Sequence, residues 1–186
     1  MKKVFCLLSG LVVLFVGLSS CDKDDPVIPN EEEVITTFIY QLTPQQGGSS
    51  IELKFVDSDG DGGQPPVYSS PKLQANTTYT GTITLLNELE KPVGNITEEV
   101  AAEGAEHQFF FATTVSGLSV AYTDKDVNGK PVGLKTTLTT KEAGSGKLKV
   151  VLRHQPDKSA KGVASGDITS AGGETDIEIS FNIDVQ

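Results

Sequence analysis

The segment IEISFNIDV, residues 177–185, decides the fold class of this chain. Its apolar residues occupy every second position, and polar or charged residues occupy the positions between them. Successive side chains of a β-strand point to opposite faces, so this alternation predicts a strand with one buried face and one solvated face. The same period of two recurs in residues 51–55, 79–85 and 148–153.

The remaining pattern predicts further strands and little helix. Less regular β-rich runs cover residues 34–42, 107–114, 118–123 and 134–140, and clusters of Gly, Pro, Asn and Asp separate them. About eight antiparallel strands predict an all-β sandwich of immunoglobulin-like architecture, because each sheet must bury its apolar face. A small barrel is the alternative, and the immunoglobulin Cys–Trp–Cys core is absent because the chain has no Trp.

Two segments depart from the strand pattern. One short helix is predicted over residues 96–103, with Thr97 as its cap and acidic residues in its first turn. Residues 157–173 are rich in Gly, Ser, Ala and Lys, and this composition predicts a mobile loop.

Length and charge exclude several function classes. The chain has 186 residues, which suits one domain, and 25 Asp and Glu against 15 Lys and Arg give a net charge of -10. A nucleic-acid binder must neutralise phosphates with basic side chains, so this acidic balance argues against one. The sequence holds no P-loop, nucleophile elbow, dinucleotide fingerprint or HExxH motif, and we expect a protein that is not an enzyme.

The first 20 residues are predicted to be an export signal. Lys2 and Lys3 precede an apolar run over residues 4–18, which is short for a membrane span and ends in small residues. The sequence LSSC at residues 18–21 resembles the bacterial lipobox, and this resemblance implies cleavage before Cys21 and acylation of that Cys. The alternatives are an ordinary signal peptide or a single anchor helix.

A short charged motif follows the Cys. Lys23, Asp24 and Asp25 resemble the export tag of surface lipoproteins in Bacteroidetes, which implies an outer-membrane protein that faces outward. The alternative is a solvated acidic tether without a targeting role. Residues 21–33, with the acidic run at 31–33, are predicted to form a lipidated acidic tether, and residues 34–186 form the sandwich domain.

Two loops share the pattern D-x-D-x-[DN]-G, in which alternate oxygen-bearing side chains converge on a tight Gly turn. The calcium candidates are Asp57, Asp59 and Asp61 in the first loop and Asp124, Asp126 and Asn128 in the second. Both loops resemble the first half of an EF-hand loop, but its twelfth position is Tyr68 in one and Lys135 in the other. The alternative is that these residues only build β-turns.

The two His residues are candidates for a transition-metal site. His107 and His154 each lie at the end of a predicted strand, on the face shared with apolar neighbours. Two such imidazoles can hold zinc, copper or a haem iron, with help from a carboxylate of Glu106, Asp124 or Asp176. The alternative is a local hydrogen bond for each His at the sandwich rim.

The whole chain resembles small cell-surface lipoproteins of Bacteroidetes, of the kind found with TonB-dependent uptake receptors. The matching parts are residues 18–21 and 22–25 and, more loosely, 57–63, 106–111, 124–134, 153–156 and 173–181. The resemblance implies an outer-membrane lipoprotein that acts as a non-enzymatic accessory module for nutrient uptake. Its partners would be the membrane and an outer-membrane receptor, and it requires no cofactor, with calcium as an optional ligand.

Two other functions remain open at this point. One is a metal-binding lipoprotein, with calcium at the Asp loops or zinc or haem at the two His residues. The other is a structural or adhesion component of the cell surface.

Overall fold

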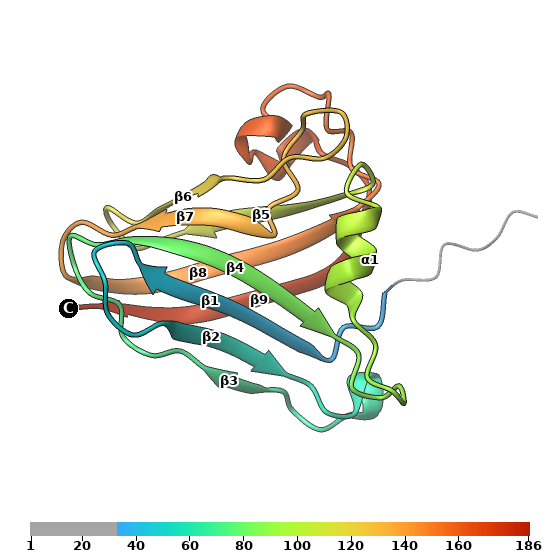
Figure 1. Cartoon of the computed structure of the whole chain (residues 1–186), viewed down its shortest axis with the longest axis horizontal. Helices are drawn as coiled ribbons and strands as arrows, with labels where there is room; N and C mark the ends of the chain where they lie inside the picture. The colour runs from blue at the N-terminus through green and yellow to red at the C-terminus, as the bar shows by residue number, and fades with distance from the viewer. Residues whose placement is uncertain (1–32) are drawn as a thin grey trace, which may run out of the picture. The chain divides into compact units, whose positions relative to one another are not determined.

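The computed structural model describes residues 33–186, whose strands form two antiparallel sheets (Figure 1). The first sheet has the order β3-β2-β1-β4-β7-β6. Its strands are β1 (Thr37–Pro44), β2 (Ile51–Val56), β3 (Val67–Ser69), β4 (Thr78–Leu86), β6 (Ser119–Tyr122) and β7 (Lys135–Thr139). The second sheet has the order β5-β8-β9. Its strands are β5 (His107–Thr113), β8 (Gly144–His154) and β9 (Glu174–Val185).

The predicted all-β sandwich with one short helix is confirmed. All eight predicted strands are present in the described chain, and the ninth, β3, was not predicted. The strands divide six and three between the sheets, whereas an immunoglobulin constant domain divides four and three. Strand β8 begins at Gly144, earlier than its apolar pattern, because residues 144–147 pair by backbone with the end of β9.

Aromatic side chains from both sheets meet in the core. Phe38 of β1 lies 6.3 Å from Phe109 of β5 and 5.9 Å from Phe181 of β9, measured between ring centroids. Tyr40 of β1 lies 5.9 Å from Phe111 of β5. These contacts join the inward faces that the alternating sequence predicts, so the hydrophobic core holds the two sheets together.

Helix α1 (Ile96–Ala102) connects β4 to β5 and lies across one end of the strands (Figure 1). Ile96 and Val100 are its buried residues and belong to the main core. The predicted cap at Thr97 is wrong, because Asn95 occupies the cap position and makes no side-chain capping bond. The Thr97 hydroxyl instead accepts from the Leu85 amide at 2.7 Å and donates to the Leu85 carbonyl at 3.0 Å, which fixes α1 to β4.

Helix α1 has seven residues. Within residues 33–186, no helix has the length and apolar character that a membrane crossing requires.

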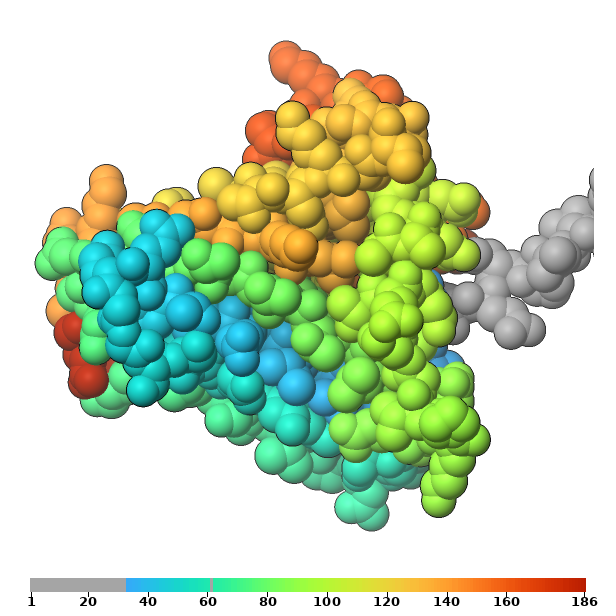
Figure 2. All heavy atoms as spheres, viewed as in Figure 1, coloured from blue at the N-terminus to red at the C-terminus, as the bar shows by residue number. Residues whose placement is uncertain are grey.

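Residues 157–173 are folded rather than an irregular loop. They contain two short 3₁₀ helices, η2 (Val163–Ser165) and η3 (Ile168–Ser170). Val163 and Ala171 are fully buried against Phe110 and Val151, on the outer face of the second sheet. The segment projects beside the 124–134 loop at one corner of the domain (Figure 2). The composition predicted a mobile loop, whereas the segment forms 3₁₀ turns and packs Val163 and Ala171, with Ala160 and Ile168 beside them, in a small apolar cluster.

Candidate functional site

The two His side chains lie directly opposite each other. His107 is the first residue of β5, His154 is the last residue of β8, and the two are register partners in the antiparallel ladder. Their ring centroids are 4.6 Å apart, and the exposed fractions of the residues are 0% and 6%. The ladder therefore brings together two residues that are far apart in the sequence, at the end of the sandwich.

Two of the three predicted carboxylates reach the His pair. Asp176 places Oδ2 3.8 Å from His107 Nε2 and Oδ1 3.8 Å from His154 Nδ1. Glu106 places Oε2 3.8 Å from His154 Nε2, but its side chain is half-exposed. Asp124 lies elsewhere, because its carboxylate accepts from the Gly133 amide at 2.8 Å and from the Lys135 amide at 2.9 Å.

A β-bulge turns Asp176 toward the His pair. Leu152 pairs with Ile177, but Arg153 pairs with Thr175, so Asp176 is the extra residue of the bulge. Strict alternation would place Asp176 on the outer face with Glu178, whose side chain is 51% exposed. The Asp176 side chain is instead completely buried, which is how a bulge redirects a side chain.

Two acidic residues join the site without having been predicted. Glu33, just before β1, places Oε1 3.4 Å from His107 Nε2, and its side chain is only 11% exposed. Glu103, which ends α1, joins Glu33 and His107 in a group whose ligand atoms lie within 4.8 Å of one another. His107, His154 and Asp176 form a second group by the same measure.

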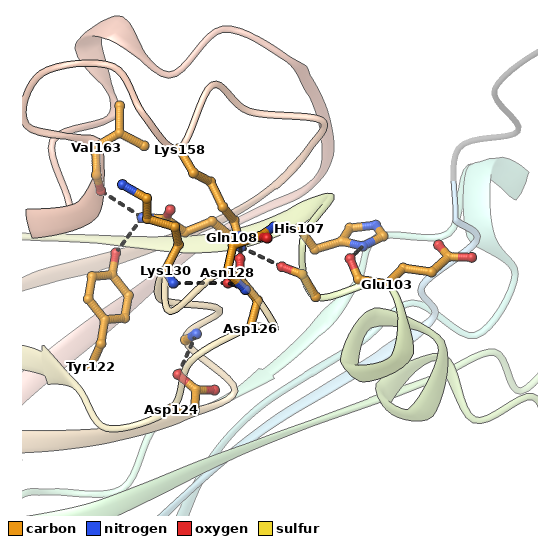
Figure 3. A network of polar contacts seen from close by, with 12 residues as sticks. Glu103, His107, Gln108, Tyr122, Asp124, Asp126, Asn128, Lys130, Lys158 and Val163 are labelled. Atoms are coloured by element: carbon orange, nitrogen blue, oxygen red, sulfur yellow. Dashed lines mark hydrogen bonds and ion pairs between the residues drawn. The ribbon is translucent and has the colours of Figure 1, made fainter.

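The hydrogen bond at His107 Nδ1 determines what Nε2 can do. Nδ1 lies 3.3 Å from the carbonyl oxygen of Glu103, which can only accept, so Nδ1 carries the hydrogen (Figure 3). Neutral His107 then directs the Nε2 lone pair at the carboxylates of Glu33 and Asp176. Within the described chain, Nε2 has no hydrogen-bond partner of acceptable geometry. A lone pair that faces carboxylates is stabilised by a proton on one carboxyl group or by a metal ion between them.

Burial and like charges shift His107 and Glu33 toward their uncharged forms. Burial lowers the pKa of His107, which disfavours the imidazolium form. Burial, followed by the neighbouring charges of Asp176, Glu99 and Glu103, raises the pKa of Glu33 to about 7. A bound cation would oppose these shifts, because it stabilises the neutral imidazole and the ionised carboxylates as ligands.

The second Asp loop uses its oxygens internally. Asp126 Oδ1 accepts from the amides of Asn128 at 2.8 Å and Lys130 at 2.9 Å. Asp126 Oδ2 accepts from Lys158 Nζ at 2.9 Å, and Lys158 also donates to the Gly104 carbonyl (Figure 3). Both oxygens of Asp126 and both oxygens of Asp124 thus accept from protein donors, and this geometry favours the turn-forming interpretation of Asp124, Asp126 and Asn128.

The first Asp loop forms a 3₁₀ turn, η1 (Gly60–Gly62). Asp59 Oδ2 accepts from the Gln64 amide at 3.2 Å. The Oδ1 atoms of Asp57 and Asp59 are buried without a hydrogen-bond partner among the described residues, and the Asp61 side chain lies outside the description. Calcium at this loop stays a prediction.

The candidate residues of the export and anchoring segment lie outside the described residues. These are Cys21 and the export-tag residues Lys23, Asp24 and Asp25. Their roles stay predictions from the sequence.

Comparison of the chain with known proteins found no matching family model, no matching curated protein and no matching solved structure.

Proposed function

We propose that this protein is a lipid-anchored, non-enzymatic module that binds a zinc-like divalent transition-metal ion at His107, His154 and Asp176. The observation that supports the proposal is the Nε2 lone pair of buried His107, which faces the carboxylates of Asp176 and Glu33 at 3.8 and 3.4 Å. Neutral imidazole and carboxylate together are common zinc ligands.

The spacing of the donor atoms suits zinc. With metal–ligand bonds of about 2.1 Å, tetrahedral geometry places neighbouring ligand atoms about 3.4 Å apart. Three contacts are close to this spacing: His107 Nε2 lies 3.4 Å from Glu33 Oε1 and 3.8 Å from Asp176 Oδ2, and His154 Nδ1 lies 3.8 Å from Asp176 Oδ1. The ligand atoms of His107, His154 and Asp176 all lie within 4.8 Å of one another, so side-chain movements of about an ångström would bring them around one ion. Calcium prefers six to eight oxygen ligands, and a site with two imidazoles does not supply them.

The His pair is poorly arranged for haem. Bis-His ligation places the porphyrin plane between the two imidazoles. The rings of His107 and His154 are 4.6 Å apart and both are buried, so the described structure leaves no space for a macrocycle between them. We therefore propose an ion rather than haem.

The lipobox-like and export-tag-like sequences support a location of the proposed site at the outer membrane. A protein acylated at Cys21 would hold the ion at the outer membrane, where an uptake receptor is the expected partner. The binding and delivery of a metal nutrient is thus a role that is consistent with both the lipid anchor and the metal site. A pull-down from outer membranes is expected to enrich such a receptor, and a stringent pull-down without one would leave the module without this partner.

Metal analysis and thermal unfolding test the site. We expect the purified protein to bind one zinc ion, and zinc at a hundredfold excess over its Kd to stabilise the fold by about 2.7 kcal/mol. Calcium, haem and EDTA serve as comparisons in the same melts. The expected zinc shift is larger than any shift with calcium or haem.

Two matched carboxylate variants separate the site from general charge effects. Asp176→Asn removes a proposed ligand and is expected to weaken zinc binding at least tenfold. Asp184→Asn removes the same charge from an exposed residue of β9, which forms an ion pair with Lys72, and this variant should not change the zinc affinity. A wild-type protein that neither retains zinc nor shifts its melting temperature with zinc contradicts the proposed function.

A further inference from the structure

Glu33 lies where the polypeptide enters the sandwich domain. Strand β1 begins at Thr37, and Thr36 already donates a backbone hydrogen bond to the Leu86 carbonyl at 3.0 Å. Among the described residues, no backbone hydrogen bond outside the strands and helices involves residues 33–35. Ile35 packs partly against the core, whereas Val34 is exposed. Among the described contacts, the Glu33 side chain is therefore the main attachment of residues 33 and 34 to the domain.

That attachment points into the candidate metal site. Glu33 Oε1 lies 3.4 Å from His107 Nε2, and Oε2 is buried without a hydrogen-bond partner in the described chain. The same His107 nitrogen faces Asp176 Oδ2 at 3.8 Å. Glu33, from the segment before β1, and Asp176, from β9, thus both face His107 Nε2.

Without a cation, this approach is electrostatically unfavourable. The carboxylates of Glu33 and Asp176 converge on one lone pair, and Glu99 and Glu103 of the α1 region add further negative charge. Like charges in a site that excludes water repel each other strongly. A divalent ion reverses the sign of this interaction and converts Glu33 from a repelled group into a ligand.

We propose, on the basis of the metal site described above, that Glu33 is the fourth ligand and that metal occupancy holds the chain at Glu33 against the end of the sandwich. Loss of the ion releases Glu33 and Val34, and the first fixed residue becomes Ile35. Two released residues span about 7 Å when extended. Metal status thereby changes the length of the segment between the domain and its proposed lipid anchor.

The order parameter S² of the Val34 amide, measured by NMR relaxation on the full acylated chain in detergent, tests this inference, because it reports backbone order without requiring a hydrogen bond. In the wild-type protein, zinc is expected to raise S² at Val34 from below about 0.6 to about 0.85. In Glu33→Gln, zinc should still bind through the other three ligands, with affinity reduced about tenfold, and S² at Val34 should stay below about 0.6. The matched control is Glu142→Gln, which alters an exposed Glu in the β7–β8 turn and should behave as the wild type.

The outcomes separate this inference from the proposed function. A wild-type protein that binds zinc without a rise in the order parameter of Val34 overturns the inference and leaves the metal site intact. The same holds if Glu33→Gln keeps wild-type affinity or if zinc still orders Val34 in that variant. A wild-type protein that binds no zinc overturns both. A zinc-dependent rise in the order parameter of Val34 in the wild type, its absence in Glu33→Gln and its retention in Glu142→Gln support the inference.

Discussion

Lys158 and Asp126 form a buried ion pair, with Nζ 2.9 Å from Oδ2 and side-chain exposed fractions of 6% and 1%. The pair joins the 157–173 segment to the 124–130 loop. Lys158 also donates to the carbonyl of Gly104, three residues before His107. One ammonium group therefore ties two loops to the chain that leads into the candidate metal site.

Substitution of Asp126 and substitution of Lys158 should lower the free energy of unfolding by different amounts. Asp126→Asn is expected to lower the free energy of unfolding by about 3–5 kcal/mol, because it leaves the Lys158 charge buried without its partner. Lys158→Met should cost less, since Asp126 keeps two backbone amide donors. The double variant should recover part of the loss. Urea denaturation of the four proteins gives the coupling energy. A loss below 1 kcal/mol in Asp126→Asn would show that water already solvates the pair.

Glu33 should give the metal-free protein a pH-dependent stability. Without the ion, only the protonated, uncharged carboxyl of Glu33 can stay beside Asp176, and the ionised carboxylate is the form that is released. The pKa of its carboxyl is raised from 4.5 to about 7, first by burial and then by Asp176, Glu99 and Glu103, and His107 also faces the carboxyl. Between these two pH values the folded state binds more protons than the unfolded state, so this contribution to stability falls as pH rises from 4.5 to 7 and is constant above 7.

The measurement compares unfolding of the wild type and Glu33→Gln in EDTA across this pH range. The difference between the two unfolding free energies isolates the carboxyl from all other titrating groups. A difference that does not vary with pH would mean that Glu33 is solvated in the metal-free protein.

Neighbouring Gly residues provide a steric test of the His154 position. A Cβ at Gly173, where φ is +69°, would lie 2.2 Å from the carbonyl oxygen of His154, whereas a Cβ at Gly172, where φ is +60°, meets nothing within 4 Å. Gly172→Ala should therefore cost only the left-handed backbone strain of about 1–2 kcal/mol. Gly173→Ala must also displace the backbone beside His154, and it should cost more and weaken zinc binding. Equal losses of stability in the two variants, with equal zinc affinity, would contradict this expectation.

Anchoring through Cys21 predicts a specific mature terminus. Mass spectrometry of the native protein should find a chain that begins at an acylated Cys21, and the protein should fractionate with membranes. Each buried acyl methylene contributes about 0.8 kcal/mol, so several chains hold the protein firmly. Cys21→Ser should abolish acylation, whereas Cys6→Ser should leave it intact because residue 6 lies in the removed signal. A free thiol at Cys21 in the mature protein would exclude the lipoprotein interpretation.

The sequence predicted strands well where side chains alternate and poorly where they do not. The alternation in residues 177–185 and 51–55 predicts which side chains are buried, because one face of each strand meets the core and the other meets solvent. Strand β3 has three exposed residues at the edge of the sheet, so no burial pattern marks it. The Thr97 cap was predicted from residue type alone. Its hydroxyl is recruited by β4, which is a tertiary contact that local propensity does not encode.

The candidate site was only partly accessible from sequence for similar reasons. His107 and His154 were assigned to strand ends on the inward side, but their pairing depends on the ladder register. Asp176 was one of three carboxylates considered as additional ligands. The sequence did not single it out, because a β-bulge rather than strand alternation decides the direction of its side chain. Glu33 belongs to a run of three Glu residues that indicates a solvated tether, and nothing in that run predicts that the Glu33 carboxylate faces His107.

The pairing of residues 107 and 154 across one ladder makes the site sensitive to insertions in strands and tolerant of insertions in loops. Adding a single residue within β5 would rotate one imidazole to the opposite face of the sheet and abolish coordination. Lengthening the connections between these strands would leave both rings in place. Homologous chains that keep this chemistry should therefore vary in loop length. They should preserve the two-residue spacing between His107 and Phe109 in β5 and between Leu152 and His154 in β8.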